Sequence, residues 1–495
     1  MTDVQYLRRA AGTVLASAAL AAAGALVAPA APAQAFGFSP SSQYSGSSPY
    51  FGNSSWNVDA VTGTSVQSSL AAIGATETRL TGRGIGIAMV DTGVAPVAGL
   101  TGGNVVNGPD LSFDSQDPAT RHIDRDGHGT HLAGIMVGRA AGDFSGGVAP
   151  EAKLISVKVG AGSGVVDVGQ VIAGIDWVVA HRLDDPIHRI RVLELAYGTD
   201  SVQGSLVDPL AHAVETAWRA GIVVVVAGGN AGGNTPLLDP ATDPYVIAVG
   251  ALDTQGTASG ADDRISDFTS RGETKRRLDV VMPGRSIISL RAPGSAADTG
   301  YPTARVGANA FKGSGSSQAT AFAAGAVALI LQNRPTLTPD QVKGLITRDS
   351  RVITAVSTAD NGLRAMNLAA TTYDTAPTKA QTWARSTGLG TLEGSRGSVH
   401  ISDGTTELRG ENDIFGPLST AGWAVAATNI SSWNAKGQWM GRDMTGSGYS
   451  VDSSGMLSWA GRAWSGRAWS GRAWSAAKWS SSSWSGNSWS GDNWN

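Results

Sequence analysis

Short apolar runs alternate with longer amphipathic stretches through the middle of the chain. Each run is mostly apolar and rich in β-branched residues, which favours strands buried on both faces of a sheet. The runs cover residues 85–90, 153–159, 192–197, 222–227 and 246–249. Between them, residues 168–179 and 206–220 carry apolar side chains at three- and four-residue spacing, as amphipathic helices do. This alternation predicts an α/β fold with a parallel central sheet and helices on both faces.

Two more amphipathic stretches, residues 319–333 and 339–347, complete this unit, which we expect to span residues 66–370. On either side the apolar periodicity stops. Residues 36–65 are rich in Ser and Gly and are predicted to be a leader or a short pro-segment, whereas residues 371–455 form a Gly-, Ser- and Thr-rich C-terminal region. With 65 glycines among 495 residues, the chain is predicted to hold one large domain with appendages.

The first segment, residues 1–35, has the features of a secretory signal peptide. Two arginines precede an apolar stretch over residues 10–27, and Ala33-Gln34-Ala35 then supplies a small-x-small cleavage pattern. A membrane anchor is the alternative, but alanine dominates the stretch and the cleavage pattern follows promptly. We therefore expect a secreted, extracellular protein whose mature chain begins near Phe36. The chain contains no cysteine, so we expect no disulfide bonds.

Residues 456–495 form a Trp-repeat tail with a five-residue period. The repeated residues are Trp459, Trp464, Trp469, Trp474, Trp479, Trp484, Trp489 and Trp494. Such a period makes a stripe on neither a helix nor a strand. Stacking on cell-wall sugars, a membrane interface, a self-paired repeat and disorder remain open. We favour contact with the cell wall or envelope and retention at the cell surface, which equal release with and without the tail would contradict.

Overall charge argues against one class of partner. Lys and Arg number 37 and Asp and Glu 40, which gives a net charge of -3. A balanced chain of this kind lacks the excess of basic residues that nucleic acid binding favours. We therefore expect no nucleic acid partner.

Candidate chemistry begins with His128, which stands between two glycines just before an apolar helical run. The glycines leave room for a substrate to reach the imidazole. His131 lies three residues further on the same helical face, so a metal pair is the first alternative. A zinc site needs a third ligand, yet the chain has no cysteine and no His-Glu-x-x-His motif. The segment therefore favours a catalytic base, and we assign no metal ligand.

Three further polar residues stand where a catalytic base needs them. Asp91 and Asn230 each follow a predicted strand, at the carboxyl edge where open α/β sheets bind ligands. Ser317 opens a predicted helix, where backbone N–H groups can stabilise an oxyanion. Each residue alone also fits an ordinary turn or helix cap, and Ser314 or Ser316 could equally provide the cap. An acid, a base, an amide and a hydroxyl together favour nucleophilic catalysis.

These segments resemble the subtilases, the subtilisin-like serine peptidases, over residues 65–370. The chain order Asp91, His128, Ser317 is the order of that family. The matching segments are residues 87–93, 128–134, 147–150, 157–159, 227–230, 267–272, 283–284, 315–321 and 324–325. The resemblance implies a subtilisin-like fold and singles out Ser317, rather than Ser314 or Ser316, as the nucleophile.

The roles that the resemblance implies are specific. Ser317 attacks the scissile carbonyl, His128 moves its proton to the leaving amine, and Asp91 holds the imidazole. Asn230 and the backbone N–H of Ser317 form the oxyanion hole. His131 matches a structural position of the family.

Substrate contacts follow from the same resemblance. The main chain of a protein or peptide substrate is expected to pair with two edges, near residues 164–166 and 195–197. Leu238 is expected to line the primary specificity pocket and to make it shallow or apolar. The candidate substrate-binding residues are Gly164, Leu195, Ala196, Tyr197 and Leu238.

Some positions depart from the family pattern. Glu194 stands where a neutral amide is usual beside the substrate. If its side chain is buried near His128 it should affect the imidazole, and if it faces outward it should have no effect. Many subtilases have a long folding pro-domain, but only about 45 residues are available here after the signal peptide and before the core. No cofactor is expected to be required, and structural calcium is compatible with the family although no liganding loop is identified.

The sequence therefore predicts a secreted serine endopeptidase that forms an acyl-enzyme on Ser317. The alternative is an attenuated peptidase fold, weakened by Glu194, that acts as a cell-surface binding protein through its Trp-repeat tail.

Overall fold

The computed structural model describes most of the chain between residues 63 and 443. Within that range it leaves out residues 76–77, 117, 163, 165, 355–356, 402–406 and 415, and beyond it the strands β21 (Tyr449–Val451) and β22 (Leu457–Trp459) are described. The predicted signal peptide, nearly all of the predicted leader and most of the Trp-repeat tail lie outside the described residues.

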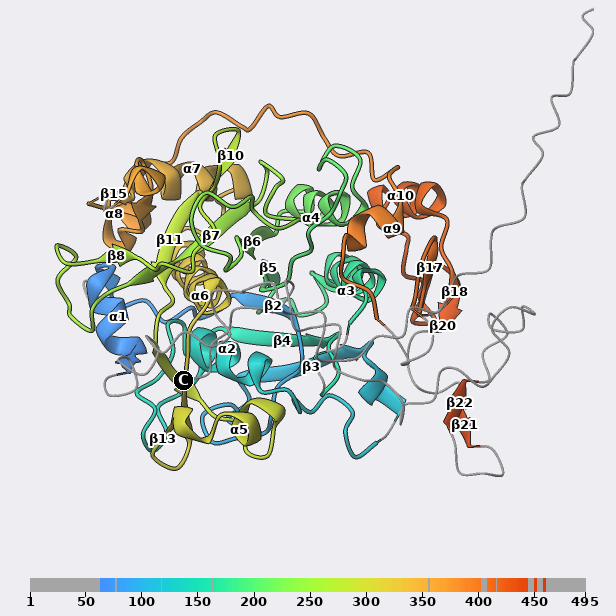
Figure 1. Cartoon of the computed structure of the whole chain (residues 1–495), viewed down its shortest axis with the longest axis horizontal. Coiled ribbons are helices and arrows are strands. Elements are labelled where there is room, and N and C mark those ends of the chain that lie inside the picture. Colours follow the sequence, from blue (N-terminus) through green and yellow to red (C-terminus); the bar gives the residue numbers. More distant parts are fainter. Residues whose placement is uncertain are drawn as a thin grey trace, which may run out of the picture.

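A ten-stranded sheet runs through the centre of the molecule (Figure 1). Its order is β15-β16-β11-β7-β6-β5-β2-β4-β3, with β8 paired to β7. Its strands are β2 (Gly86–Asp91), β3 (Val105–Asp110), β4 (Lys153–Lys158), β5 (Ile190–Leu195), β6 (Val223–Ala227), β7 (Ile247–Asp253), β8 (Arg264–Ile265), β11 (Val280–Pro283), β15 (Arg351–Val352) and β16 (Arg364–Ala365). All neighbours pair in parallel except β7 with β8 and β15 with β16. The five apolar runs of the sequence all form strands of this sheet.

Helices cover both faces of the sheet, as predicted. One face carries α2 (His128–Val137) and α6 (Ser316–Asn333), which pack against each other. The other carries α3 (Val168–His181) and α4 (Pro209–Arg219) (Figure 1). The remaining helices are α1 (Val66–Ala72), α5 (Ala296–Gly300), α7 (Pro339–Asp349), α8 (Leu368–Tyr373), α9 (Leu392–Arg396) and α10 (Thr420–Thr428), with short 3₁₀ turns at Phe113–Gln116, Pro302–Ala304 and Thr358–Asp360. None of the helices in the described part of the chain is long and apolar enough to span a bilayer.

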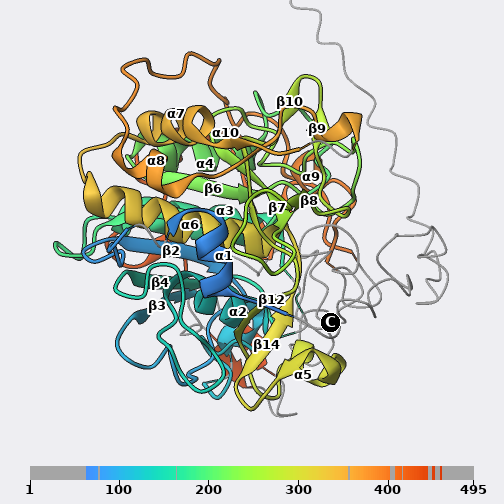
Figure 2. The same ribbon diagram turned by 90° about the vertical axis from the view of Figure 1, so that its left-hand side faces the viewer.

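Smaller sheets lie around this core. Strand β12 (Ile287–Leu290) packs on α2, and Figure 2 shows it there beside β14. That sheet contains β1 (Thr64–Ser65), β13 (Arg305–Val306) and β14 (Ala310–Gly313) as well. Two-stranded ribbons are formed by β9 (Gly272–Glu273) with β10 (Arg276–Arg277), β17 (Asn412–Asp413) with β18 (Gly416–Pro417), β19 (Gln438–Trp439) with β20 (Arg442–Asp443), and β21 with β22.

Helix starts follow local capping chemistry. The Asp208 side chain accepts hydrogen bonds from the N–H groups of Leu210 and Ala211, and Pro209 takes the first helical position. The helix predicted from residue 206 therefore begins at Pro209. In α3, Asp167 and Gln170 form a reciprocal capping box.

One hydrophobic core continues past residue 370, where the sequence predicted that the large domain ends. Leu392, Trp423 and Trp439 are fully buried in the same cluster as the central strands. Helix α9 packs on α3 and α4, and α10 packs on α4 (Figure 1). The described residues after 370 therefore extend the main body of the protein.

Candidate active site

Asp91 and His128 form a buried pair at the carboxyl edge of the sheet. Asp91 is the last residue of β2, and His128 is the first of α2. The Nδ1 of His128 lies 3.0 and 2.9 Å from the two carboxylate oxygens of Asp91. Because Nδ1 faces Asp91, a proton exchanged with a ligand has to use Nε2 on the other side of the ring.

Burial dominates the electrostatics of Asp91. It raises the pKa of the carboxyl above its usual range, while the nearby His128 and a hydrogen bond from Thr92 N–H oppose that rise. Gly129 allows the close approach of α2, because a Cβ there would lie 2.2 Å from the carbonyl oxygen of Gly93. The glycine beside His128 is thus required by packing against the end of β2.

Asp124, which sequence reasoning missed, holds the first turn of α2. Its Oδ1 accepts hydrogen bonds from Asp126 N–H and Gly127 N–H at 3.0 and 2.8 Å. Its Oδ2 accepts from the N–H and the hydroxyl of Thr130 at 2.8 and 2.6 Å. A buried carboxylate with this many donors fixes the turn that carries His128.

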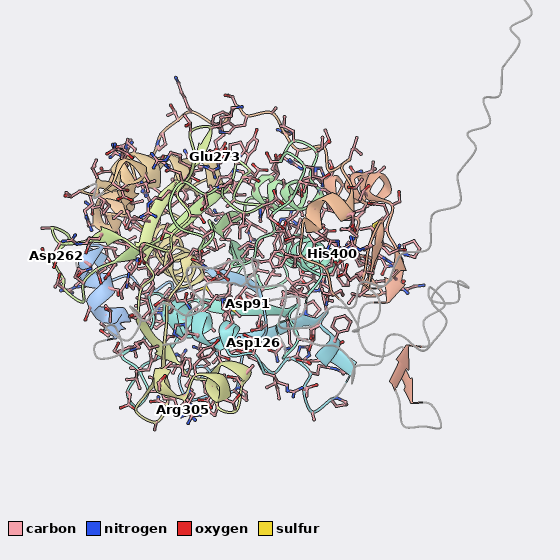
Figure 3. All side chains as sticks on the ribbon, in the orientation of Figure 1. Asp91, Asp126, Asp262, Glu273, Arg305 and His400 are labelled. Carbon is pink, nitrogen blue, oxygen red and sulfur yellow. The ribbon has the colours of Figure 1, made fainter. Side chains whose placement is uncertain are left out.

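Asp126 lies beside the same pair, and Figure 3 shows it close to Asp91. Its Oδ1 accepts a hydrogen bond from His128 N–H at 3.2 Å. Desolvation and the charge of Asp124 raise the pKa of Asp126 to about 7, although His128 opposes the rise. The sequence signal for Asp124 and Asp126 as site residues was their position, four and two residues before the candidate base His128.

His131 has a packing role, as predicted. It is fully buried, and its Nε2 lies 3.2 and 3.1 Å from the carbonyl oxygens of Ile287 and Phe311. Burial and the neighbouring His128 lower the pKa of His131 to about 3, so the ring is neutral at ordinary pH. Its hydrogen bonds tie α2 to β12 and β14.

Ser317 lies in the first turn of α6, at the same edge of the sheet. The two neighbouring serines have structural bonds. Ser314 Oγ accepts from Ser286 N–H at 2.8 Å, and Ser316 Oγ accepts from Gly229 N–H at 3.3 Å. These bonds separate Ser317, the predicted nucleophile, from the other two candidates.

Asn230 is oriented by the start of the same helix. Its Oδ1 accepts a hydrogen bond from Ser316 N–H at 2.7 Å. With Oδ1 directed at α6, the donor Nδ2 is directed away from that bond. This bond holds the Asn230 side chain at the start of α6, the helix whose first turn contains Ser317.

The predicted substrate edges are also at this end of the sheet. Leu195 ends β5, and Ala196 and Tyr197 follow it, all of them buried. The Tyr197 phenol lies within electrostatic reach of Asp167 and Arg396, and desolvation raises its pKa well above the usual range. That side chain therefore faces the C-terminal part of the chain, so only the main chain here can pair with a substrate.

Leu238 and Gly164 remain candidates for substrate contact. Leu238 is half-buried and lies against Gly198 and Gly229, where a Cβ would meet it at 2.7 and 3.2 Å. It thus separates the end of β5 from the loop that carries Asn230. Gly164, at φ +74°, adopts the left-handed conformation that favours glycine.

Glu194 is buried on the face of the sheet that α2 and α6 cover. It pairs with Met89 across β2 and β5, and Met89 alternates with Val90, which contacts Gly174 of α3. Met89, Asp91 and Glu194 therefore share the opposite face, which α6 covers. Of the two orientations considered for Glu194, the structure has the inward one.

The described part of the chain holds no group of three or more His, Asp or Glu side chains arranged for a metal ion.

The loop over residues 241–246 has several carbonyl oxygens that point to one place, but side-chain cations bind them there. Arg276 donates to the carbonyls of Ala241, Asp243 and Val246, and Lys343 Nζ donates to that of Val246 as well. Asp279 pairs with both cations at 2.9 and 3.2 Å. This loop therefore does not fit a calcium site.

Comparisons with known proteins identify the family. The family model Peptidase_S8, described as the subtilase family, matches residues 82–390. Serine protease AprX of Bacillus subtilis is 42% identical over 276 residues, which cover 54% of this chain and 61% of that protein. Subtilisin DY of Bacillus licheniformis is 34% identical over 268 residues, covering 53% of this chain and 82% of that protein.

A solved structure of a protein related to subtilisin also resembles this chain. Fervidolysin from Fervidobacterium pennivorans, a keratinolytic enzyme related to subtilisin, matches with a TM-score of 0.50 and 26% identity over 63% of this chain and 46% of that chain. The alignment with AprX spans less than two thirds of the length of that protein. The family model, which matches more than half of the chain, shows that this protein belongs to the subtilase family of serine proteases.

Proposed function

We propose that the protein is a secreted serine endopeptidase that hydrolyses peptide bonds through an acyl-enzyme on Ser317. The buried Asp91–His128 pair carries this proposal, because it lies at the same sheet edge as Asn230 and Ser317. Membership of the subtilase family supports it. Secretion is supported by the apolar stretch and the Ala33-Gln34-Ala35 pattern at the N-terminus.

The chemistry follows from the geometry of the pair. His128 Nε2 removes the proton of the Ser317 hydroxyl as Oγ attacks the scissile carbonyl. Asp91 keeps the proton of the imidazole on Nδ1 and stabilises the imidazolium that forms. Asn230 Nδ2 and the N–H of Ser317 donate to the oxyanion. In subtilisin itself, loss of the corresponding amide lowers turnover about 10²- to 10³-fold.

A fluorophosphonate probe tests the proposal, because it labels only an activated serine. The folded protein should be labelled at Ser317, and Ser317→Ala should abolish labelling. Ser314→Ala is the matched control and should retain it, since the Ser314 hydroxyl bonds to the Ser286 backbone. Mass spectrometry locates the modified residue. Absence of label on Ser317 in folded protein would contradict the proposal.

The second candidate is an attenuated peptidase fold, and the buried position of Glu194 is the observation that favours it. Glu194→Gln keeps the size of the side chain and removes its acid. If Glu194 weakens the catalytic centre, the Gln variant should be labelled faster than the unaltered protein. Equal labelling rates would exclude attenuation by this residue.

A further inference from the structure

The described chain between residues 385 and 443 contacts the outer side of α3 and α4, away from α6. We call residues 391–398, which include α9, the brace. Figure 1 shows α9 and α10 beside α3 and α4. The brace contains one of the largest fully buried side chains of the described protein, that of Arg396. A buried guanidinium is costly unless several acceptors surround it, so its partners indicate what it holds.

Arg396 binds the segment just beyond the first predicted substrate edge. Its Nε donates to Asp167 Oδ1 at 2.6 Å and its Nη2 to Oδ2 at 3.3 Å. Both side chains of this ion pair are fully buried. The guanidinium also donates to the carbonyls of Gly410 and Asn412 and to the Glu393 carboxylate, so that its five N–H groups all have acceptors. Asp167 caps α3 only three residues after Gly164, so Arg396 is bonded close to that edge.

The residue before it binds the continuation of the second predicted edge. Thr199, two residues after Tyr197, donates from Oγ1 to the carbonyl of Ser395 at 2.5 Å. The hydroxyl of Ser395 donates to Asp208 Oδ1 at 2.9 Å. The backbone of Thr199 pairs in both directions with Asp239, next to Leu238, at 2.9 Å. The brace therefore reaches the wall of the predicted specificity pocket as well.

The two connections meet at Tyr197. Its buried phenol lies within electrostatic reach of Asp167, Arg396, Asp239 and Asp208. Asp167 and Asp208 bond to the brace directly, and Asp239 pairs with Thr199, which bonds to the brace.

We propose that Arg396 and Ser395 are positioning residues that set the separation of the two edges that hold the substrate main chain. This rests on the proposed peptidase function. They touch neither Asp91 nor His128 among the bonds of the described residues, so they act on the binding of extended substrates and leave the reactivity of Ser317 unchanged. A small probe that contacts only the catalytic centre does not depend on them.

Arg396→Lys is the principal variant, because it keeps the charge and loses the paired contacts with Asp167. Arg409→Lys is the matched control, an arginine of the same part of the chain whose side chain is 61% exposed. KM for an extended peptide should rise by about tenfold in Arg396→Lys, the scale expected for a small misplacement of a binding edge. Fluorophosphonate labelling should stay within about twofold of the unaltered protein, and Arg409→Lys should change neither quantity.

Thr199→Val provides a milder second variant in case Arg396→Lys does not fold. It removes only the hydrogen bond to Ser395 and should also raise KM for the extended peptide. An unchanged KM in a folded variant would overturn the proposal, as would an equal loss of peptide hydrolysis and small-probe labelling.

Hydrogen exchange separates this proposal from the proposed function. Amides of residues 166–171 and 199–202 should exchange faster in Arg396→Lys than in Arg409→Lys. If the unaltered protein neither reacts with the fluorophosphonate nor cleaves the peptide, the proposed peptidase function is wrong. The role of the brace is then tested by amide hydrogen exchange alone, and equal exchange rates in the two variants would reject it.

Discussion

Asp126 places a titrating carboxyl two positions before His128. Its pKa of about 7 means that it changes charge within the pH range where an imidazole base also titrates. The attraction between Asp126 and His128 is reciprocal, so an ionised Asp126 favours the protonated imidazole.

Asp126→Asn should move the acidic limb of the kcat/KM profile to lower pH, because it removes a negative charge that favours the imidazolium. Asp185→Asn, in the exposed loop after α3, is the control and should leave the limb in place. The measurement is peptide hydrolysis from pH 5 to 9 at low salt. An acidic limb that does not move in Asp126→Asn would contradict a role for this charge.

At this scale the sequence anticipated some contacts and not others. A strand end and a glycine-flanked histidine make Asp91 and His128 recognisable as candidates, and the family resemblance predicts that they pair. Asp124 was missed because its role depends on backbone N–H groups that only the folded turn directs at one carboxylate. The burial of Glu194 is not predictable, because a single acid in an apolar run does not indicate which face of the sheet its side chain is on.

Among the elements, the central strands were predictable because each is a short, mostly apolar run rich in β-branched residues. Edge strands such as β3 and β15 were not, since they are short or partly exposed. The α3 helix was predicted, but the sequence does not show that a carboxyl on this helix accepts hydrogen bonds from two tryptophans. Asp176 Oδ2 accepts from Trp423 and Trp439 at 2.7 and 2.8 Å. Burial raises the pKa of Asp176 to about 6, although these hydrogen bonds oppose the rise.

The titration of Asp176 makes the stability of α3 pH-dependent. Its folded pKa of about 6 exceeds the usual 3.8, so the folded state holds a proton that the unfolded state releases between those values. Stability from this group is therefore greatest at low pH and falls as pH rises through that window, by up to about 3 kcal/mol.

Asp176→Asn should remove this titration while leaving an oxygen acceptor for the indoles. The variant should gain stability relative to the unaltered protein on going from pH 4 to pH 7, measured by urea unfolding. Asp185→Asn should show almost no trend in this range, because hydrogen bonds from the His188 and Ile187 backbone lower the pKa of Asp185, which therefore titrates below pH 4. A stability difference for Asp176→Asn that is constant with pH would refute this account.

At the scale of the whole molecule, the Gly-, Ser- and Thr-rich composition concealed how residues 371–443 pack. A few large side chains anchor that stretch, and they are too widely spaced to produce a periodic signal. Trp423, Trp439 and Arg396 are all buried against α3 or its capping residue. The α/β class was predictable because it depends on the order of elements, whereas this docking depends on single contacts between distant residues.

Truncation measures what that docking contributes. A chain that ends at residue 443 should keep its unfolding temperature, because the contacts of residues 385–443 with α3 and α4 are retained. A chain that ends at residue 384 loses Arg396 and both indoles, which removes the partners of Asp167 and Asp176 and uncovers the faces of α3 and α4 that α9 and α10 pack on. It should lose about 3–5 kcal/mol or fail to fold. Thermal unfolding followed by circular dichroism distinguishes the two, and equal midpoints would contradict this expectation.

The ion pair between Arg396 and Asp167 joins residues 229 positions apart, and this separation sets the order in which the protein can mature. During synthesis, the segment that carries Asp91, His128 and even Ser317 emerges before Arg396 exists. On the role proposed for the brace, the two substrate edges of such a chain have not yet gained the contacts of Ser395 and Arg396. Tight binding of an extended peptide should therefore require translation of almost all of the described length.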